Sequence, residues 1–600
     1  MEDSRVFIDT EVVKKIHRLS RKHSEPRYGF LYGTVVSNGL VVSASCYIAG
    51  GLNNGNFMEH YMQSRCMFPV GVDPIGVFLC NCDAREVSNI IPVGENSQLS
   101  ERLVCICLDK GGEDIDLYMY NRFTKELTSS EFTETNSNSY SDHVFLRLTT
   151  PVNIHYKFSI KKAELDANCS QAVEDLLASY HSDKAYYELC GADILISNNR
   201  VIGADEEMSV EKVFKTIEKR NSENDFSGRR KKSLDEVKVI YAKALTKLTV
   251  DKSDNSVLYS PIIHYKRAEA LMVSVSIPIE AVIVVPKSQA IRSLFDLFFR
   301  SIRRQLHAVR ALLSSYTGTE IPLLRMIYFW VHGMHFPLSM VLPASSQDNQ
   351  LVDWRQDLHE KLMLLLDRPY FRLSNAYSFP QETTPSHKLI NPHLSLSQSK
   401  LSQAPTGTVH TVYGKYTYHH YMQDKFDDDK WGCAYRSLQT LISWFNLQGY
   451  SNISIPTHRE IQQTLVNIGD KEPSFVGSKQ WIGSTEVGFV LDKLLNVTCK
   501  IMFVSSGAEM ANKGRELVQH FQTQGTPIMI GGGVLAHTIL GVYYNDQTGE
   551  IKFLILDPHY TGADDLKTVL DKGWCGWKGE DFWEKTAYYN MCMPQRPIEY

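Results

Sequence analysis

Two short segments in the last third of the chain contain the residue types of a cysteine hydrolase. The run 431–437, Trp-Gly-Cys-Ala-Tyr-Arg-Ser, offers the thiol of Cys433. The run 557–559, Asp-Pro-His, offers a carboxylate and an imidazole. A thiol nucleophile needs a base beside it, and the base needs a third group that orients it. The combination therefore predicts that Cys433, His559 and Asp557 meet at one site.

Cys433 precedes a stretch with helical apolar periodicity, at Leu438, Leu441, Ile442 and Phe445. A thiol at a helix N-terminus feels the positive end of the helix dipole, which lowers its pKa from about 8.5 and favours the thiolate. The first N–H groups of such a helix can also stabilise an oxyanion. The acidic run 427–429 lies just upstream and would disfavour a thiolate, so we expect it to face solvent or substrate.

The run 551–556 is apolar apart from Lys552 and predicts a buried strand that ends at Asp557. Pro558 biases Asp557 toward extended geometry. In a strand, residues two apart share a face, so the Asp557 carboxylate and the His559 ring could hydrogen-bond. The alternative is a turn that ends the strand, with His559 exposed.

Other histidines are weaker candidates for a base. His537 follows the run 531–536 and is better explained as a buried, hydrogen-bonded residue, while His458 and His520 lie in polar helical surroundings and are expected at the surface. The triple glycine 531–533 fits either a passage for substrate backbone or a β-hairpin.

The overall composition limits the class of protein. A chain of 600 residues with 43% hydrophobic and 22% charged residues predicts two to four globular domains. A net charge of −5 gives no electrostatic argument for nucleic acid. The twelve cysteines are too thinly spread for a disulfide framework and favour a reducing compartment. The acidic first residues do not resemble a secretory signal.

No stretch reaches the roughly 18 uninterrupted apolar residues of a membrane span. We therefore expect no direct span, and any membrane association to require a partner. The pairs Cys80/Cys82 and Cys105/Cys107 lie in strand-like runs and lack the two-residue spacing common in zinc sites, so they are expected to pack as small hydrophobes. No metal and no cofactor is predicted.

Short strands and turns are expected from about residue 5 to 205, followed by a polar, basic loop near 218–234. Two further strands are expected at 273–277 and 281–285, leading into an amphipathic helix near 287–315. A segment rich in Ser, Pro and Gln, 374–407, predicts a linker. The pattern indicates a mixed α/β (α+β) protein.

Several motifs resemble the cysteine proteases specific for the ubiquitin-fold modifier, in their long form (type 2). They span nearly all of 408–600 and comprise 421–424 (Tyr-Met-Gln-Asp), 431–439, 480–484 (Gln-Trp-Ile-Gly-Ser), 529–533 and 556–560. The resemblance implies a papain-like domain over 408–600 that cleaves after the modifier's C-terminal glycine, both maturing the precursor and removing it from conjugates. It also implies Cys433 as nucleophile, His559 as base, Asp557 as its orienter and Tyr421 as oxyanion-hole donor.

The N-terminal part, residues 1–318, more faintly resembles an MPN-type α/β domain. Metal-dependent members carry His-x-His where this chain has Cys80-Asn81-Cys82, so a binding role is expected. In the long form this region is similar to a recruitment module. The resemblance implies a cytoplasmic enzyme held at the endoplasmic reticulum surface by a membrane-anchored partner. Residues 319–373 are expected to connect this domain to the linker.

Two alternatives remain open from the residues. Autophagy-type processing proteases share a Trp-Gly-Cys segment and an Asp-Pro-His run. Alternatively, the chain acts mainly as an interaction scaffold, since more than half of its residues lie outside the protease-like domain.

Overall fold

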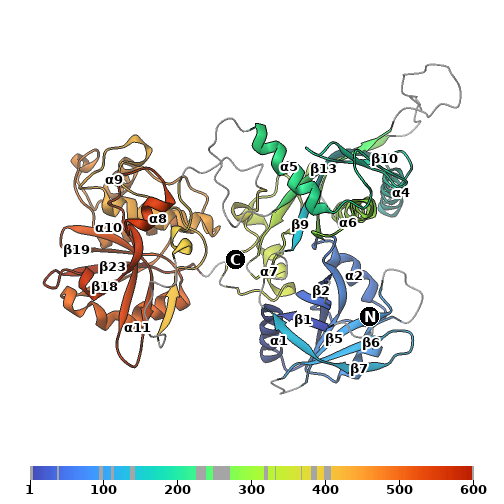
Figure 1. Ribbon diagram of the computed structural model, residues 1–600, viewed down its shortest axis with the longest axis horizontal. Coiled ribbons are helices and arrows are strands. Elements are labelled where there is room, and N and C mark those ends of the chain that lie inside the picture. The colour runs from blue at the N-terminus through green and yellow to red at the C-terminus, as the bar shows by residue number, and fades with distance from the viewer. Residues whose placement is uncertain are drawn as a thin grey trace, which may run out of the picture. The chain divides into compact units, whose positions relative to one another are not determined.

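The computed structural model describes residues 5–36, 39–92, 99–109, 114–135, 142–224, 238–247, 271–315, 322–331, 333–366, 368–379, 388–396 and 407–597. The chain divides into two compact units (Figure 1): unit 1 comprises residues 1–365 and 376–382, and unit 2 comprises residues 366–375 and 383–600. Over the described ranges, no helix is both long and apolar enough to cross a bilayer.

Unit 1 contains two large sheets. The first has eight strands in the order β7-β6-β5-β4-β2-β3-β1-β8. Its strands are β1 (Arg5–Asp9), β2 (Arg27–Val36), β3 (Gly39–Tyr47), β4 (Asp73–Cys80), β5 (Arg102–Leu108), β6 (Asp116–Asn121), β7 (Leu127–Ser130) and β8 (Phe132–Thr135). The helices of this part are α1 (Thr10–Lys22), α2 (Phe57–Arg65) and α3 (Val87–Ile90).

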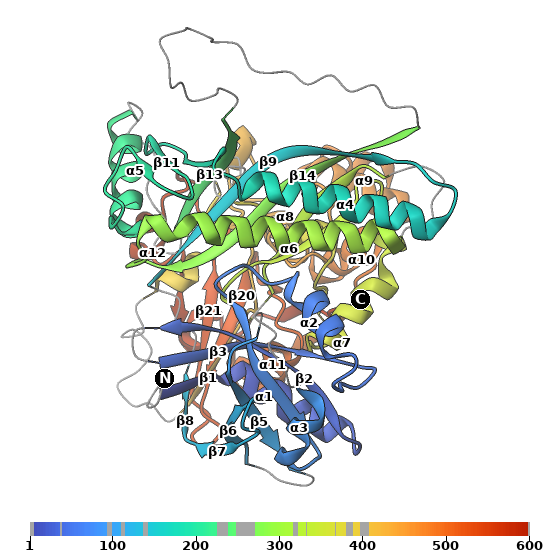
Figure 2. The ribbon, with the colours of Figure 1, turned by 90° about the vertical axis from the view of Figure 1, so that its right-hand side faces the viewer.

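The second sheet has six strands in the order β12-β11-β10-β13-β9-β14. They are β9 (His143–Lys157), β10 (Ala185–Leu189), β11 (Ile194–Ile196), β12 (Val201–Ile202), β13 (Val239–Thr246) and β14 (Met272–Pro286). Helices α4 (Lys162–Tyr180) and α6 (Leu294–Ser315) lie side by side across β9 and β14 (Figure 2). The apolar stripe of α6 is buried in the core beneath them.

The remaining elements of unit 1 are α5 (Val210–Asn224), the hairpin of β15 (Leu324–Phe329) and β16 (Leu338–Pro343), and α7 (Val352–Lys361). Most of the predicted basic loop near 218–234 lies outside the described residues, apart from its first residues at the end of α5.

Unit 2 is built on a seven-stranded sheet in the order β18-β23-β19-β20-β21-β22, with β17 also paired to β20. Its strands are β17 (Thr408–Thr411), β18 (Cys499–Val504), β19 (Ile528–Gly532), β20 (Leu535–Tyr544), β21 (Ile551–Leu556), β22 (Cys575–Lys578) and β23 (Tyr589–Pro594). Its helices are α8 (Cys433–Leu447), α9 (His458–Asn467), α10 (Ser484–Leu495), α11 (Gly514–Thr523) and α12 (Leu566–Asp571).

Each face of this sheet carries its own core because alternate residues of a strand point to opposite faces. On β19, Met529 joins the core around α8, while Ile528 and Ile530 join the core around α11. On β21, Leu554 and Leu556 likewise face α8, and Phe553 and Ile555 face the opposite side. The sheet is therefore buried on both faces, and α8 rests against β19 and β20.

The mixed α/β class predicted from the sequence is confirmed. Cys80, Cys105 and Cys107 are buried in the first sheet as expected, whereas Cys82 follows β4 and is half-buried. The proposed boundaries at 318, 373 and 407 stay predictions, and much of the 374–407 segment lies outside the described residues.

Candidate active site

Cys433 is the first residue of α8, directly after the N-cap Gly432. The prediction of a thiol at a helix N-terminus is therefore confirmed. The helix is buried on nearly every side, because it is enclosed between the sheet and the α9–α10 layer. Cys433 itself keeps 8% exposure. A buried helix fixes the position of the sulfur, and its free N–H end points toward that sulfur.

The segment that leads into α8 has an unusual backbone. Met422, Asp424, Lys425 and Lys430 all have positive φ, between 58° and 68°. Such conformations cost energy for residues with a Cβ and persist only where surrounding contacts hold them. The segment between Tyr421 and Cys433 is therefore maintained by its contacts rather than by local preference.

Asp428 supplies the central contact of this segment. Its side chain is fully buried, accepts hydrogen bonds from Arg436 Nε at 2.5 Å and from the Met422 N–H at 2.8 Å, and lies 3.0 Å from His458 Nε2. Burial works against its charged form, but His458, Arg436 and the Met422 N–H outweigh burial and hold its pKa below the ordinary value. Asp428 thus ties the segment to α8 and α9.

This contact corrects two sequence-based expectations. The acidic run was expected to face solvent or substrate, and this is wrong for Asp428, although Asp427 and Asp429 are exposed. His458, expected at the surface, is 4% exposed because it packs between Tyr435 and Phe426 beside Asp428. His520 is buried as well, with Nε2 3.0 Å from the Thr526 carbonyl.

The structure also shows why residue 432 is glycine, which the sequence alone did not reveal. A Cβ at this position would lie 2.6 Å from the side chain of Asp428. The backbone before Cys433 can therefore approach the buried carboxylate only if residue 432 is glycine.

Asp557 and His559 form the second half of the site. Strand β21 ends at Leu556, and residues 557–560 turn rather than continue the strand. Asp557 Oδ1 accepts one hydrogen bond from His559 Nδ1 at 2.6 Å and another from the His559 backbone N–H at 3.0 Å. The expected pair is present, but a turn produces it rather than shared strand geometry. His559 is not exposed, since its side chain keeps 17% of its surface.

Hydrogen bonds join this turn to the segment before α8. The Tyr421 N–H donates to the Pro558 carbonyl at 2.9 Å, and the Tyr418 hydroxyl donates to the Asp557 carbonyl. The Tyr421 ring meets the His559 ring edge-on with 5.3 Å between centroids. Segments almost 140 residues apart are thus fastened together, and Tyr421 lies beside both Cys433 and His559.

The electrostatics of the site favour an ion pair. Burial opposes ionisation of Cys433, but the hydrogen-bonding and charge of His559, the Tyr421 hydroxyl and the Ala536 backbone outweigh it and lower the thiol pKa. Burial likewise opposes a charged His559, yet Asp557 and Cys433 raise its pKa to about 9. His559 Nε2 is buried and makes no regular hydrogen bond within the described residues, which leaves it available to the sulfur.

Tyr421 stays protonated in this setting. Burial and then the charge and hydrogen bonding of Cys433 raise the pKa of its phenol well above the ordinary value. A buried phenol that keeps its proton is a hydrogen-bond donor beside the sulfur.

Strands β19 and β20 form a hairpin at the triple glycine, through a two-residue turn at Gly533 and Val534. Gly533 has φ +59°, and a Cβ at Gly532 would lie 2.1 Å from the Tyr589 ring. The hairpin expected as one explanation of these glycines is therefore present, and the passage of substrate backbone stays a prediction. The hairpin places the Ala536 backbone beside Cys433 and places His537 beside Asp557.

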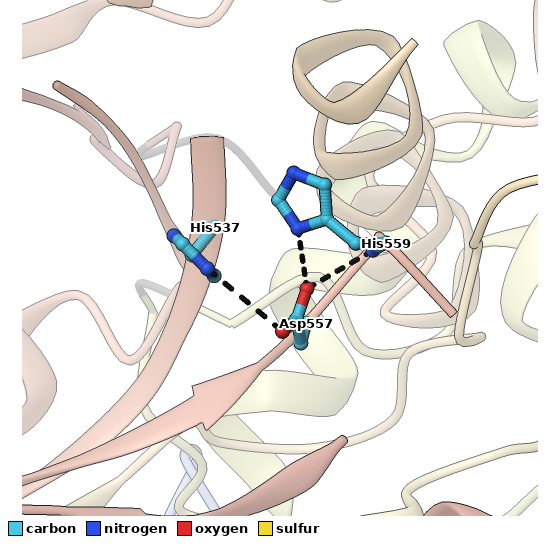
Figure 3. Close-up of side chains that lie close together, drawn as sticks. All are labelled: His537, Asp557 and His559. Carbon is cyan, nitrogen blue, oxygen red and sulfur yellow. Dashed lines mark hydrogen bonds and ion pairs between the residues drawn. The ribbon is translucent and has the colours of Figure 1, made fainter. Parts of the chain in front are cut away.

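His537 and His559 lie at different oxygens of the Asp557 carboxylate (Figure 3): His537 Nε2 is 3.9 Å from Oδ2, and the His537 ring lies 5.2 Å from the His559 ring. Burial lowers its pKa to about 4, so the ring is neutral near pH 7. Potential ligand atoms of His537, Asp557 and His559 fall within 4.8 Å of one another. Since Nδ1 of His559 already donates to Asp557, the arrangement is that of an acid–base pair.

The structure brings together all four predicted site residues: Cys433, His559, Asp557 and Tyr421. Sequence reasoning missed Asp428 and His458. The one sequence feature that could have indicated the buried role of Asp428 is Arg436, eight residues later. That spacing indicates a contact only once α8 is known to begin at Cys433.

Comparison with known proteins places this geometry in a family. Residues 407–592 match the model of peptidase family C78, and residues 170–384 match the N-terminal region of ubiquitin-fold modifier 1 specific protease 2. Ufm1-specific protease 2 of Gallus gallus is 44% identical over 427 residues, which cover 70% of this chain and 92% of that protein. The chain belongs to the Ufm1-specific protease family.

Other members of the Ufm1-specific protease family agree with this assignment. The Homo sapiens protein is 50% identical over 351 residues, 58% of this chain and 74% of that protein. The crystal structure of UfSP from C. elegans superposes with a TM-score of 0.67 at 27% identity and covers both chains fully. Unit 2 is accordingly the papain-like cysteine peptidase domain of a Ufm1-specific protease, with helix α8 packed on a sheet.

Proposed function

We propose that the chain is a thiol peptidase that cleaves after the C-terminal glycine of the ubiquitin-fold modifier Ufm1, both maturing its precursor and releasing it from conjugated proteins. The supporting observation is the Cys433 thiol at the start of α8, beside the hydrogen-bonded Asp557–His559 pair, in a chain of this family. We infer Cys433 as nucleophile, His559 as acid–base group and Asp557 as its orienter.

Peptide-bond cleavage then proceeds in two steps. The Cys433 thiolate attacks the glycine carbonyl carbon, and a C–S bond forms as the carbonyl electrons move to oxygen. The imidazolium of His559 donates its proton to the leaving nitrogen, the C–N bond breaks and a thioester remains. His559 then removes a proton from water, whose oxygen displaces the sulfur and frees the modifier's carboxylate.

In this proposal, two hydrogen-bond donors stabilise the negative oxygen that forms from the glycine carbonyl. The Tyr421 hydroxyl, protonated and buried beside the sulfur, is one, and the backbone N–H of Cys433 at the helix start is the other. Donors placed before the reaction begins stabilise the developing charge with little reorganisation.

A fusion of Ufm1 to a short C-terminal peptide tests the assignment. Wild-type protein should release the peptide, and Ufm1 carrying a C-terminal electrophile should become covalently attached to Cys433. Cys433→Ala should do neither. Unreduced cleavage by Cys433→Ala would contradict the proposal. A fusion of an autophagy-type modifier serves as the control substrate and should stay uncut, because the family relationship supports Ufm1.

We further propose that unit 1 recruits the enzyme to the cytosolic face of the endoplasmic reticulum through a membrane-anchored partner. The support is the distinct sheet-based unit that precedes the peptidase domain. Cell fractionation of full-length protein and of Cys433→Ser should find equal shares on reticulum membranes, since recruitment does not need the thiol. Loss of membrane association on treatment with protease, with lipids intact, is the expected sign of a protein partner.

A further inference from the structure

A stripe of basic side chains lies on one face of α6 and plays no part in the peptidase site. Arg303, His307 and Arg310 are spaced at i, i+4 and i+7, which puts them on the same side of the helix over about 10 Å. All three are half-buried. Arg303 and Arg310 each lie about one turn from His307, one on either side along the helix.

The Asp73 carboxylate, which contacts α6, is already engaged by other arginines of that helix. Asp73 pairs with Arg300 at 3.0 Å and with Arg304. The Arg304 guanidinium also donates to the carbonyls of Phe68 and Pro69 at 3.1 and 2.9 Å. Within the described part of the chain, neither Arg303 nor Arg310 forms an ion pair or a side-chain hydrogen bond.

The ring of His307 lies between these two arginines and has no partner either. Both Nδ1 and Nε2 are buried and make no hydrogen bond with described residues. Burial and the positive charges of Arg310, Arg303 and Arg65 lower its pKa to about 4, and no acid is among the charges that act on it. Arg65 is the last residue of α2, which lies beside α6 in Figures 1 and 2.

A buried polar group without a partner, beside the unpaired Arg303 and Arg310, is uncommon in folded proteins and asks for an explanation. A bound anion supplies both missing parts: it neutralises the charges and accepts hydrogen bonds from the arginines and the imidazole. We propose that the face of α6 formed by Arg303, His307 and Arg310 binds a phosphate monoester.

The arrangement favours phosphate over a single carboxylate or an extended acidic surface. A phosphate monoester is a compact dianion with three strong acceptor oxygens. Arg303 and Arg310 can each offer a guanidinium fork to such a group from either side of His307. The charges of Arg303 and Arg310 both act on the same imidazole.

Titration calorimetry of the full-length protein with inorganic phosphate, at constant ionic strength set by KCl, tests the proposal. Wild-type protein should show saturable binding, and the double variant Arg303→Gln/Arg310→Gln should weaken it at least about tenfold, since charged hydrogen bonds are lost. The matched control is Arg292→Gln. It removes the same charge from an exposed arginine that already pairs with Glu207 at 2.6 Å, and should bind phosphate like wild type.

Thermal unfolding gives a second measurement that does not depend on binding heats. Without phosphate, the double variant should be no less stable than wild type because repulsion is relieved. Phosphate should raise the Tm of wild type but not of the double variant. No saturable binding by wild type, or equal binding by the double variant, would overturn the proposal.

Two further ligands distinguish the source of the phosphate. Tighter binding of O-phosphoserine than of inorganic phosphate supports a phosphorylated side chain as the natural ligand. Tighter binding of a short-chain phosphatidic acid below its micelle concentration supports a lipid headgroup. Both results depend on Arg303 and Arg310 if the site is the one proposed, and insensitivity of either to the double variant would overturn it.

Discussion

The Asp557 carboxylate binds His559 twice through a single oxygen, at the ring Nδ1 and at the backbone N–H. The backbone bond fixes the turn, and the ring bond fixes which nitrogen remains for Cys433. One carboxylate oxygen therefore sets both the position and the tautomer of the proposed base. This relationship makes the charge state of Cys433 depend on Asp557, which the thiol does not need to touch.

Asp557→Asn should raise the pKa of the Cys433 thiol. An amide stabilises the imidazolium less than a carboxylate does, so His559 carries less positive charge beside the sulfur. The rate of iodoacetamide labelling of Cys433, measured against pH by mass spectrometry of its peptide, should show its midpoint at higher pH in Asp557→Asn than in wild type.

The other cysteines provide an internal control for that experiment. Burial raises the pKa of Cys46, Cys80 and Cys575 to about 12, so these thiols should stay unlabelled near pH 7 in both proteins. An unchanged midpoint for Cys433 in Asp557→Asn would contradict the dependence on the carboxylate.

The pH dependence of peptide release should follow the same ion pair. The pKa of His559, about 9, lies above its ordinary value of 6.5, so its favourable charge interaction stabilises the fold fully below pH 6.5 and is lost as pH rises through about 9. The value of kcat/KM should decline near pH 9 on the alkaline side, where the His559 imidazolium loses its proton. On the acid side it should decline as the Cys433 thiolate is protonated, with a midpoint below the ordinary pKa of a thiol. A rate that keeps rising beyond pH 9 would be inconsistent with an imidazolium as proton donor.

Tyr421→Phe should reduce kcat by about 10²–10³ and change KM little, since removal of one oxyanion donor has that typical effect. The ring contact with His559 and the backbone hydrogen bond to Pro558 remain in the variant. Steady-state kinetics with the Ufm1 fusion and a thermal unfolding curve check both points. A loss of less than about fivefold with an intact Tm would show that the hydroxyl is not such a donor.

Short-range patterns predicted the elements that depend on their own sequence. The helix expected near 287–315 is α6 with a short 3₁₀ turn before it, because its apolar stripe repeats with helical period. The strands expected at 273–277 and 281–285 are one strand, β14, although Pro278 interrupts the pattern. Pro278 faces Pro151 of β9, so neither strand needs an N–H there, and the ladder continues.

Roles that depend on contacts between distant segments of the chain could not be predicted from the sequence. The pairing of Asp557 with His559 was predictable because a single residue separates them in the sequence. Tyr421 had to come from family resemblance, since only the meeting of its segment with the 557–560 turn gives it a role. Asp428 was misjudged for the same reason: a carboxylate in an acidic run is usually solvated, and its burial depends on Arg436 and His458.

Asp428→Asn should cost about 3–5 kcal/mol of the free energy of unfolding of unit 2, the range found when one partner of a buried ion pair is removed. Its pKa is lowered in the folded protein, so its contribution is present above its unfolded pKa and is lost as pH falls below that value. Urea unfolding at pH 7 measures the cost. Asp427→Asn, at an exposed neighbouring carboxylate, is the matched control and should differ from wild type by less than about 0.5 kcal/mol.

His537→Asn should lower kcat/KM about tenfold with little change in stability, because the Asp557 carboxylate loses the ring that lies beside its Oδ2 and against the His559 ring. The alkaline limit of the pH profile should shift as well, since a less confined carboxylate holds the His559 proton less well. His520→Asn is the control: that histidine is equally buried and its pKa is likewise lowered to about 4, but it hydrogen-bonds at Thr526 on α11's side of the sheet. If both variants retain wild-type kcat/KM and pH profile, His537 serves only the packing against Phe582 and Trp583. A change confined to His537→Asn would instead mark it as a positioning residue that acts through Asp557.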